Sequence, residues 1–218
     1  MSSILPIINP FNGSLKDFSH VDEPYKSIVE IMGSANPSLF YNEVKSFLEN
    51  DSNVKIWKET FSEDISENLN KYQEYNTDYN IEELVHEIDT NGMIIPDGQY
   101  LFHGGFLNLR DKEERYLDRV FATSITPEEA FFHASLGGRA YDNEKIEILI
   151  ILVKEPKTKS LILFSDGATL SHEYEVLFNS GLLLKVLGKI PALFTKKVDD
   201  CNGKEKDVLI DIIFCTIS

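Results

Sequence analysis

Two glutamates with one residue between them, Glu173 and Glu175, stand at the start of an apolar run that continues to Phe178. Successive side chains of a β-strand point to opposite faces, so this spacing predicts two carboxylates on one face of a strand. Such a pair could stabilise a positive charge that develops on a substrate and could accept a proton. The structural alternative is a pair of solvated acids on the exposed face of an edge strand.

Two upstream stretches carry further polar groups at the ends of expected strands. The first runs into two glycines, where His103 presents its ring nitrogens and Gly104 lets a backbone approach a ligand closely. The second, at residues 121–126, ends in hydroxyl side chains, of which Thr123 and Ser124 could bond sheet backbone or hold a sugar or a carboxylate. For both stretches the alternative is a purely structural use, with the polar groups bonded to backbone.

The order and spacing of these three motifs resemble the mono-ADP-ribosyltransferase superfamily, in particular its Arg-Ser-Glu branch of bacterial and phage enzymes and exotoxins. In that branch a first strand carries Arg, a second carries an aromatic-x-Ser-Thr-Ser pattern, and a third carries Glu-x-Glu. The likeness extends from about Gly98 to the C-terminus, and the third motif matches closely, with Gly181 a few residues later.

The first two motifs depart from the branch. Thr123 replaces the first Ser of the second motif, Ser124 stands at the Thr position, and Ile125 stands where the last Ser would lie. His103 stands where the branch has Arg, which resembles the His-Tyr-Glu branch of diphtheria toxin and the poly-ADP-ribose polymerases. The departures bear on the contacts to NAD more than on the resemblance itself.

The resemblance implies an enzyme that moves ADP-ribose from NAD to a target protein, with NAD as substrate and no metal. Glu175 would be the catalytic glutamate, which stabilises the positive charge that grows as nicotinamide leaves. Glu173 would meet the acceptor, and a Glu at this position goes with arginine. His103 would hold the adenosine ribose or a phosphate, with Gly104 allowing close approach.

The same resemblance implies supporting roles. Thr123 would position Glu175 through a hydroxyl hydrogen bond, and Ser124 would lie beside it among the cofactor-binding residues. The segment 161–172 matches in place the loop that reads the target protein, which makes Phe164 and Asp166 candidates for target recognition.

Three other hypotheses stay open at this point. A NAD glycohydrolase toxin uses the same fold and lets water replace the acceptor. A catalytically silent ADP-ribosyltransferase-like module would bind a partner or nucleotide without turnover. An unrelated α+β protein could carry the three motifs by coincidence.

Around these motifs, periodicity predicts the elements that position them. Apolar residues at helical spacing predict helices around 25–32, 40–48 and 81–88, and a further helix is expected within 59–75, which is polar and only weakly periodic. β-branched and aromatic runs predict strands at 100–103, 119–123, 146–153, 160–164, 174–178, 182–186 and 208–217.

One helix interrupts the strands, with Thr126 as its expected N-cap, Pro127 at its first position and Glu129 completing a capping box. Helices followed by strands predict an α+β fold, with residues 1–94 as a helical N-terminal region and 95–218 as the catalytic core. By resemblance that core consists of two small packed β-sheets with an NAD cleft between them.

Composition limits the partners and the compartment. A formal net charge of -15, from 36 acidic and 21 basic side chains, argues against binding to a nucleic-acid backbone. Cys201 and Cys215 form no disulfide framework and suit a reducing compartment. The histidines are scattered in the sequence, so no metal site is expected.

The start of the chain has no basic segment followed by an apolar run, and the longest apolar stretch, residues 148–153, is too short to span a bilayer. A cytoplasmic protein is expected, or one delivered into a host or target cell without a signal peptide. Its expected partners are a target protein that supplies the acceptor arginine and, if the chain is a toxin, an immunity protein.

Overall fold

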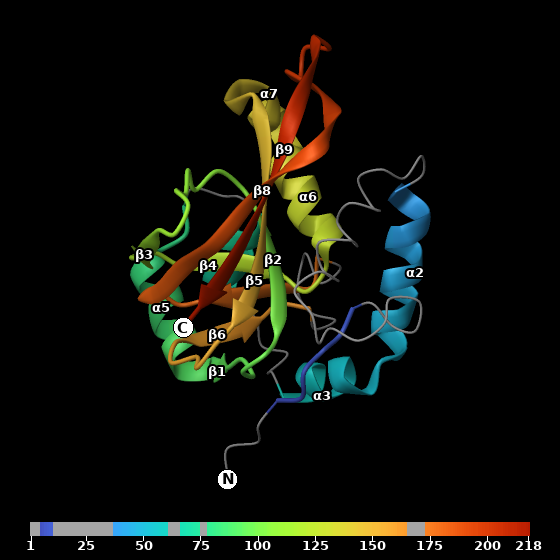
Figure 1. Ribbon diagram of the computed structural model, residues 1–218. Coiled ribbons are helices and arrows are strands. Elements are labelled where there is room, and N and C mark those ends of the chain that lie inside the picture. The colour runs from blue at the N-terminus through green and yellow to red at the C-terminus, as the bar shows by residue number, and fades with distance from the viewer. Residues whose placement is uncertain (1–4, 11–36, 61–65, 75–77, 165–172) are drawn as a thin grey trace.

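The computed structural model describes residues 5–10, 37–60, 66–74, 78–164 and 173–218, and these form an α+β fold (Figure 1). Helices dominate before Gly92 and strands dominate after it, which confirms the predicted fold class. Among the described residues, no helix combines the length and the apolar character needed to cross a membrane.

Four helices are described in the N-terminal region: α2 (Pro37–Asn50), α3 (Ser52–Thr60), α4 (Glu67–Gln73) and α5 (Ile81–Asn91). The helices expected around 40–48 and 81–88 are confirmed as α2 and α5. α5 begins where the Asn80 side chain accepts hydrogen bonds from two backbone N–H groups, and it ends at Gly92. The helix expected around 25–32 lies outside the described residues.

The helix α3 was not predicted from the sequence. It buries Val54 and Trp57, while most of its other side chains are charged or polar, so its apolar periodicity is weak. Trp57 is fully buried and donates its indole N–H to the carbonyl oxygen of Pro6 at 2.7 Å. The tertiary contacts of Trp57 therefore stabilise α3, because packing against the rest of the protein contributes more to a short helix than its own sequence pattern does.

All nine described strands belong to one hydrogen-bonded sheet, in the order β1-β6-β7-β4-β2-β5-β9-β8-β3. Their bounds are β1 (Met93–Ile94), β2 (Tyr100–Gly104), β3 (Glu114–Leu117), β4 (Phe121–Ser124), β5 (Lys145–Val153), β6 (Lys159–Ile162), β7 (Glu175–Phe178), β8 (Leu182–Asp199) and β9 (Glu205–Ile217). The two packed sheets implied by the resemblance are therefore two halves of one continuous sheet, joined where β2 pairs with β5.

The sheet curls so that both halves contribute to a single core. Alternate residues of β7 and β9, such as Val176 and Ile213, share this core with Trp57 of α3. The opposite faces of the two halves are covered by different helices. α6 (Pro127–Ser135) and α7 (Arg139–Asn143) cover β5 and β9, whereas α4 and α5 cover β6 and β7.

The hairpin of β8 and β9 is longer than the sequence pattern predicted. β8 was expected to end near Val186 but continues to Asp199, with register shifts against β9 after Val186 and after Pro191. Gly188 and Pro191 interrupt the pattern of a regular strand, and strands accommodate such residues at bulges. The short β3, also missed, pairs with β8 at the edge of the sheet.

Candidate active site

A pocket lies between α4 and α6, over the ends of β2, β4 and β7. Its empty volume is about 740 Å³, counting the space open to solvent at its mouth. Its walls include every predicted catalytic and cofactor-binding residue: His103, Gly104, Thr123, Ser124, Glu173 and Glu175. The remaining lining residues are Tyr72, Gln73, Phe102, Ala122, Glu129, Ala130, His133 and Arg139.

Glu175 is the first residue of β7, and its carboxyl group is buried in the pocket. Its two neighbours along the chain, Tyr174 and Val176, belong to the central core. Gln73 of α4 donates from Nε2 to Oε2 of Glu175 at 3.3 Å. Burial raises the pKa of Glu175 to about 7, with the Gln73 bond lowering it and the charge of Glu173 raising it further.

Two hydroxyl groups of β4 hold the backbone on either side of Glu175. Thr123 donates from Oγ1 to the carbonyl oxygen of Val176 at 2.8 Å, and Ser124 donates from Oγ to that of Glu173 at 2.7 Å. The residue between the two glutamates, Tyr174, has a positive φ of 49°, which is uncommon for a side chain of this size and does not occur in a regular strand. The prediction that both glutamates lie on one strand is therefore corrected: β7 begins at Glu175, and Glu173 lies before it. Thr123 therefore bonds the carbonyl next to Glu175 and does not bond the glutamate side chain itself.

The ring of His103 lies under the pocket and is fixed in one tautomer. Its Nδ1 is 2.8 Å from the carbonyl oxygen of Ala122, and because a carbonyl can only accept, Nδ1 carries the proton. Burial lowers the pKa of His103 to about 4, so the ring is neutral at pH 7 and Nε2 is left as an acceptor. A neutral acceptor suits a hydroxyl group and does not supply the positive charge that a phosphate needs.

Gly104 lines the pocket, but the group that approaches it closely is part of the protein. A Cβ atom added at Gly104 would lie 1.5 Å from the carbonyl oxygen of Ala130 in α6. The glycine lets α6 pack directly against β2, and its expected role in the close approach of a ligand stays a prediction.

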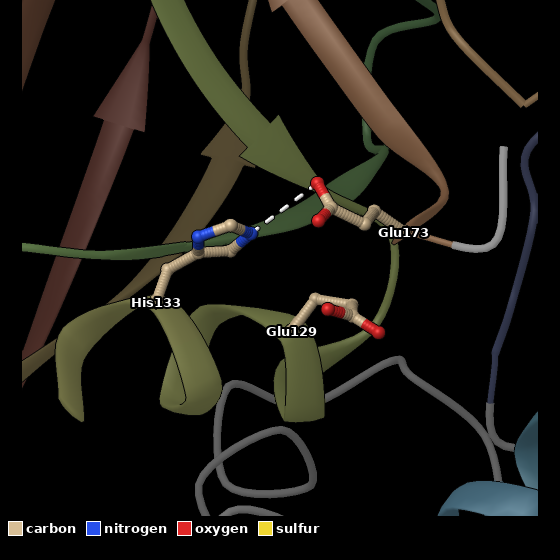
Figure 2. Close-up of side chains that lie close together, drawn as sticks. All are labelled: Glu129, His133 and Glu173. Carbon is tan, nitrogen blue, oxygen red and sulfur yellow. Dashed lines mark ion pairs between the residues drawn. The ribbon is translucent and has the colours of Figure 1, made fainter. Parts of the chain in front are cut away.

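Sequence analysis missed Glu129 and His133, which lie one turn apart on α6 and face the two glutamates of the pocket. His133 Nε2 is 3.3 Å from Glu173 Oε2 (Figure 2). The predicted capping box is wrong, because Thr126 makes no side-chain cap bond and Glu129 points into the pocket. The one-turn spacing of a carboxylate and an imidazole was the available signal.

The carboxylate of Glu129 is 7% exposed and has no hydrogen bond or ion pair with any described residue. Burial and then the charge of Glu173 raise its pKa to about 7, although His133 and Lys45 act in the opposite direction. The bond to Glu173 raises the pKa of His133. Ligand atoms of Glu129, His133 and Glu173 all lie within 4.8 Å of one another, a spacing that could also hold a metal ion and that scattered histidines did not predict.

Arg139, the first residue of α7, was also missed. Among the described residues that line the pocket it is the one Lys or Arg, and its guanidinium makes no ion pair with a described residue. It faces a pocket with three carboxylates, from Glu129, Glu173 and Glu175. Nothing in the sequence around Arg139 pointed to this position.

The two predicted target-recognition residues fare differently. Phe164 is fully buried and packs against Trp57 and Tyr174, with ring centroids at 6.2 and 5.4 Å. A side chain inside the central core cannot contact a target protein, so that assignment is corrected. Asp166 lies outside the described residues.

Comparison with known proteins finds similarity at the level of structure only, since no protein-family model and no curated protein matches the sequence. The ADP-ribosyltransferase Vis of Vibrio splendidus, in complex with an inhibitor, is similar at 14% identity over 95% of this chain and 77% of its own, with a TM-score of 0.41. C3stau2 from S. aureus with NAD is similar at 15% identity over 94% and 99%, with a TM-score of 0.40. The ADP-ribosyltransferase toxin Plx2a from Paenibacillus larvae is similar at 9% identity over 82% and 96%, with a TM-score of 0.41. Each similarity concerns the fold and assigns no role to a residue of this chain.

Proposed function

We propose that this chain is a mono-ADP-ribosyltransferase that moves ADP-ribose from NAD to an arginine of a target protein and releases nicotinamide. The observation that carries the proposal is the pair Glu173 and Glu175 on one pocket wall, with hydroxyl groups of β4 holding the backbone beside each. A pair held this firmly suits a reaction in which one carboxylate acts on the substrate and the other on the acceptor.

Glu175 is the group that promotes cleavage of NAD. The bond between nicotinamide and ribose breaks with its electron pair going to nicotinamide, which leaves positive charge on the ribose. A buried carboxylate stabilises this charge strongly, because little water screens it. Gln73 holds one carboxylate oxygen of Glu175 in place, so the charge is positioned before the substrate arrives.

Glu173 serves the acceptor. A guanidinium nitrogen attacks the ribose carbon, a new C–N bond forms, and the proton released in that step passes to a nearby carboxylate. Glu173 lies on the same wall as Glu175 and accepts from His133 in the absence of acceptor. A carboxylate suits a guanidinium because two oxygens match its paired N–H donors.

The remaining parts of NAD match other pocket residues. The pyrophosphate is anionic, and three carboxylates in the lining would repel it, so the guanidinium of Arg139 is the group to bind it. Nε2 of His103 is an acceptor for a ribose hydroxyl. Arg139 thereby supplies the positive charge that the neutral His103 does not.

Incubation of the purified chain with labelled NAD, with and without a cell lysate, tests the proposal. Free nicotinamide and label retained on macromolecules are both followed over time. Retained label supports transfer and marks the band from which to identify the target. Nicotinamide without retained label would indicate a glycohydrolase. The absence of both nicotinamide and retained label would reject enzymatic activity.

A further inference from the structure

The three side chains of Figure 2 contain one carboxylate more than they can balance. His133 makes its ion pair with Glu173, and Glu129 has no hydrogen bond or ion pair with a described residue, although the charges of His133 and Lys45 also act on it. Glu129 is nearly buried, and a carboxylate in that position is unfavourable unless a positive group binds it. The side chain lines the pocket, so the group that balances it can come from a ligand.

We infer that Glu129 and Glu173 together form the subsite that receives the guanidinium of the acceptor, an inference that rests on the proposed function. One carboxylate comes from α6 and the other from the residue two positions before β7, and one oxygen atom of each lies within 4.8 Å of the other. A planar guanidinium has donors on more than one edge and can bond both groups at once. With His133 charged and both carboxylates ionised, the bound acceptor supplies the second cation, so that two anions face two cations.

A compact ammonium fits this arrangement less well. It is a point charge that is more strongly hydrated than a guanidinium. It also lacks the planar set of N–H donors with which a guanidinium can bond two carboxylates at once. Glu129 therefore favours arginine over lysine as acceptor. Glu129 also lies on a different element from Glu175, since α6 and β7 are separate. The subsite is therefore lined from two sides.

Steady-state transfer to agmatine, a small guanidine that needs no target protein, tests this inference. We expect Glu129→Gln to raise the KM for agmatine about tenfold, because a buried charge-assisted contact is lost. The ratio of ADP-ribosyl agmatine to free ADP-ribose should fall by a similar factor. Glu129→Asp, which keeps the charge on a shorter side chain, should recover part of the affinity.

Two controls separate this effect from general damage. Glu128→Gln changes a neighbouring buried glutamate of α6 that does not line the pocket, and it should leave the product ratio unchanged. Putrescine, with an ammonium in place of the guanidinium, should be a poor acceptor for the parent and should respond little to Glu129→Gln.

The outcomes distinguish this inference from the proposed function. A parent protein that releases no nicotinamide rejects the proposed function itself. A parent that modifies agmatine, with a KM unaltered by Glu129→Gln, overturns the inference and leaves the proposed function standing. Equal use of putrescine and agmatine by the parent would also overturn it.

Discussion

Gln73 and Glu175 are 102 residues apart in the sequence, yet the amide of the first donates to the carboxylate of the second at 3.3 Å. Gln73 belongs to α4 of the helical N-terminal region, and it is 3% exposed. The helices before the sheet therefore form part of the pocket, in addition to supporting it. A donor placed on a buried carboxylate favours its ionised form.

This bond predicts a specific pH dependence. The pKa of Glu175 is raised to about 7, so the ionised form is lost as the pH falls below 7, and kcat/KM for NAD cleavage should fall with it. Gln73→Leu removes the bond that favours ionisation. The acidic limb of the kcat/KM profile should then move to higher pH by roughly half to one pH unit, the equivalent of one hydrogen bond. Lys71→Ala, on the same helix but paired with Glu67 on the surface, should leave the limb in place. An identical profile for Gln73→Leu and the parent would contradict the role of Gln73.

The two glutamates should respond differently to loss of charge. Glu175→Gln keeps the shape of the side chain and should reduce both nicotinamide release and transfer by about 10²–10³-fold, as removal of a transition-state stabiliser does. Glu173→Gln should abolish transfer to arginine while part of the NAD hydrolysis remains. Product analysis by mass spectrometry measures both reactions, and an equal loss of both in the Glu173 variant would reject this division of labour.

Arg139 should govern the affinity for NAD. Arg139→Ala is expected to raise the KM for NAD about tenfold, with a smaller effect on kcat, because the pyrophosphate loses its positive partner. Arg139→Lys should recover only part of the affinity, since an ammonium cannot grip two oxygens in a plane.

Arg119 provides the comparison for that experiment. Its charge acts on His103 but it does not line the pocket, so Arg119→Ala should change the KM less than Arg139→Ala. A larger change of KM in Arg119→Ala than in Arg139→Ala would contradict the assignment of Arg139 to the pyrophosphate.

Glu128 predicts a change of stability with pH. Both oxygens of its carboxyl group are buried without a hydrogen-bond partner among the described residues, and burial raises its pKa to about 7. Between pH 4.5 and 7 the unfolded chain releases this proton while the folded chain retains it, so stability falls as the pH rises through this window.

A glutamine cannot ionise. The melting temperature of Glu128→Gln minus that of the parent should therefore be higher at pH 8 than at pH 5. Thermal denaturation at the two pH values measures this difference. Glu67→Gln is the control, because the pKa of the exposed Glu67 is lowered by Lys71 and its variant should shift slightly in the opposite direction. The same difference at both pH values would contradict the buried state of Glu128.

Local patterns were sufficient to predict the strands β2, β4 and β7 and the helix α6, which carry most of the pocket residues. Strand alternation predicted that Glu173 and Glu175 share one face of a strand; both line the pocket, but only Glu175 belongs to β7. The hydroxyl groups of Thr123 and Ser124 were correctly placed at the end of a strand. The placement of the two hydroxyl groups depends on the geometry of a single strand, whereas the placement of Glu173 beside Glu175 depends on the left-handed backbone at Tyr174, which alternation does not predict.

Packing between elements decided the rest of the pocket. Gln73, Glu129, His133 and Arg139 come from helices that cover the sheet, and their places in the pocket depend on how closely α4, α6 and α7 lie against it. Gly104 permits that approach for α6, and Phe164 lies in the core because the sheet curls around it. The sequence by itself determined the strands that carry Glu175, Thr123 and Ser124. Only the tertiary structure decided which groups these residues meet, because those contacts join residues whose separation along the chain carries no information about their distance in space.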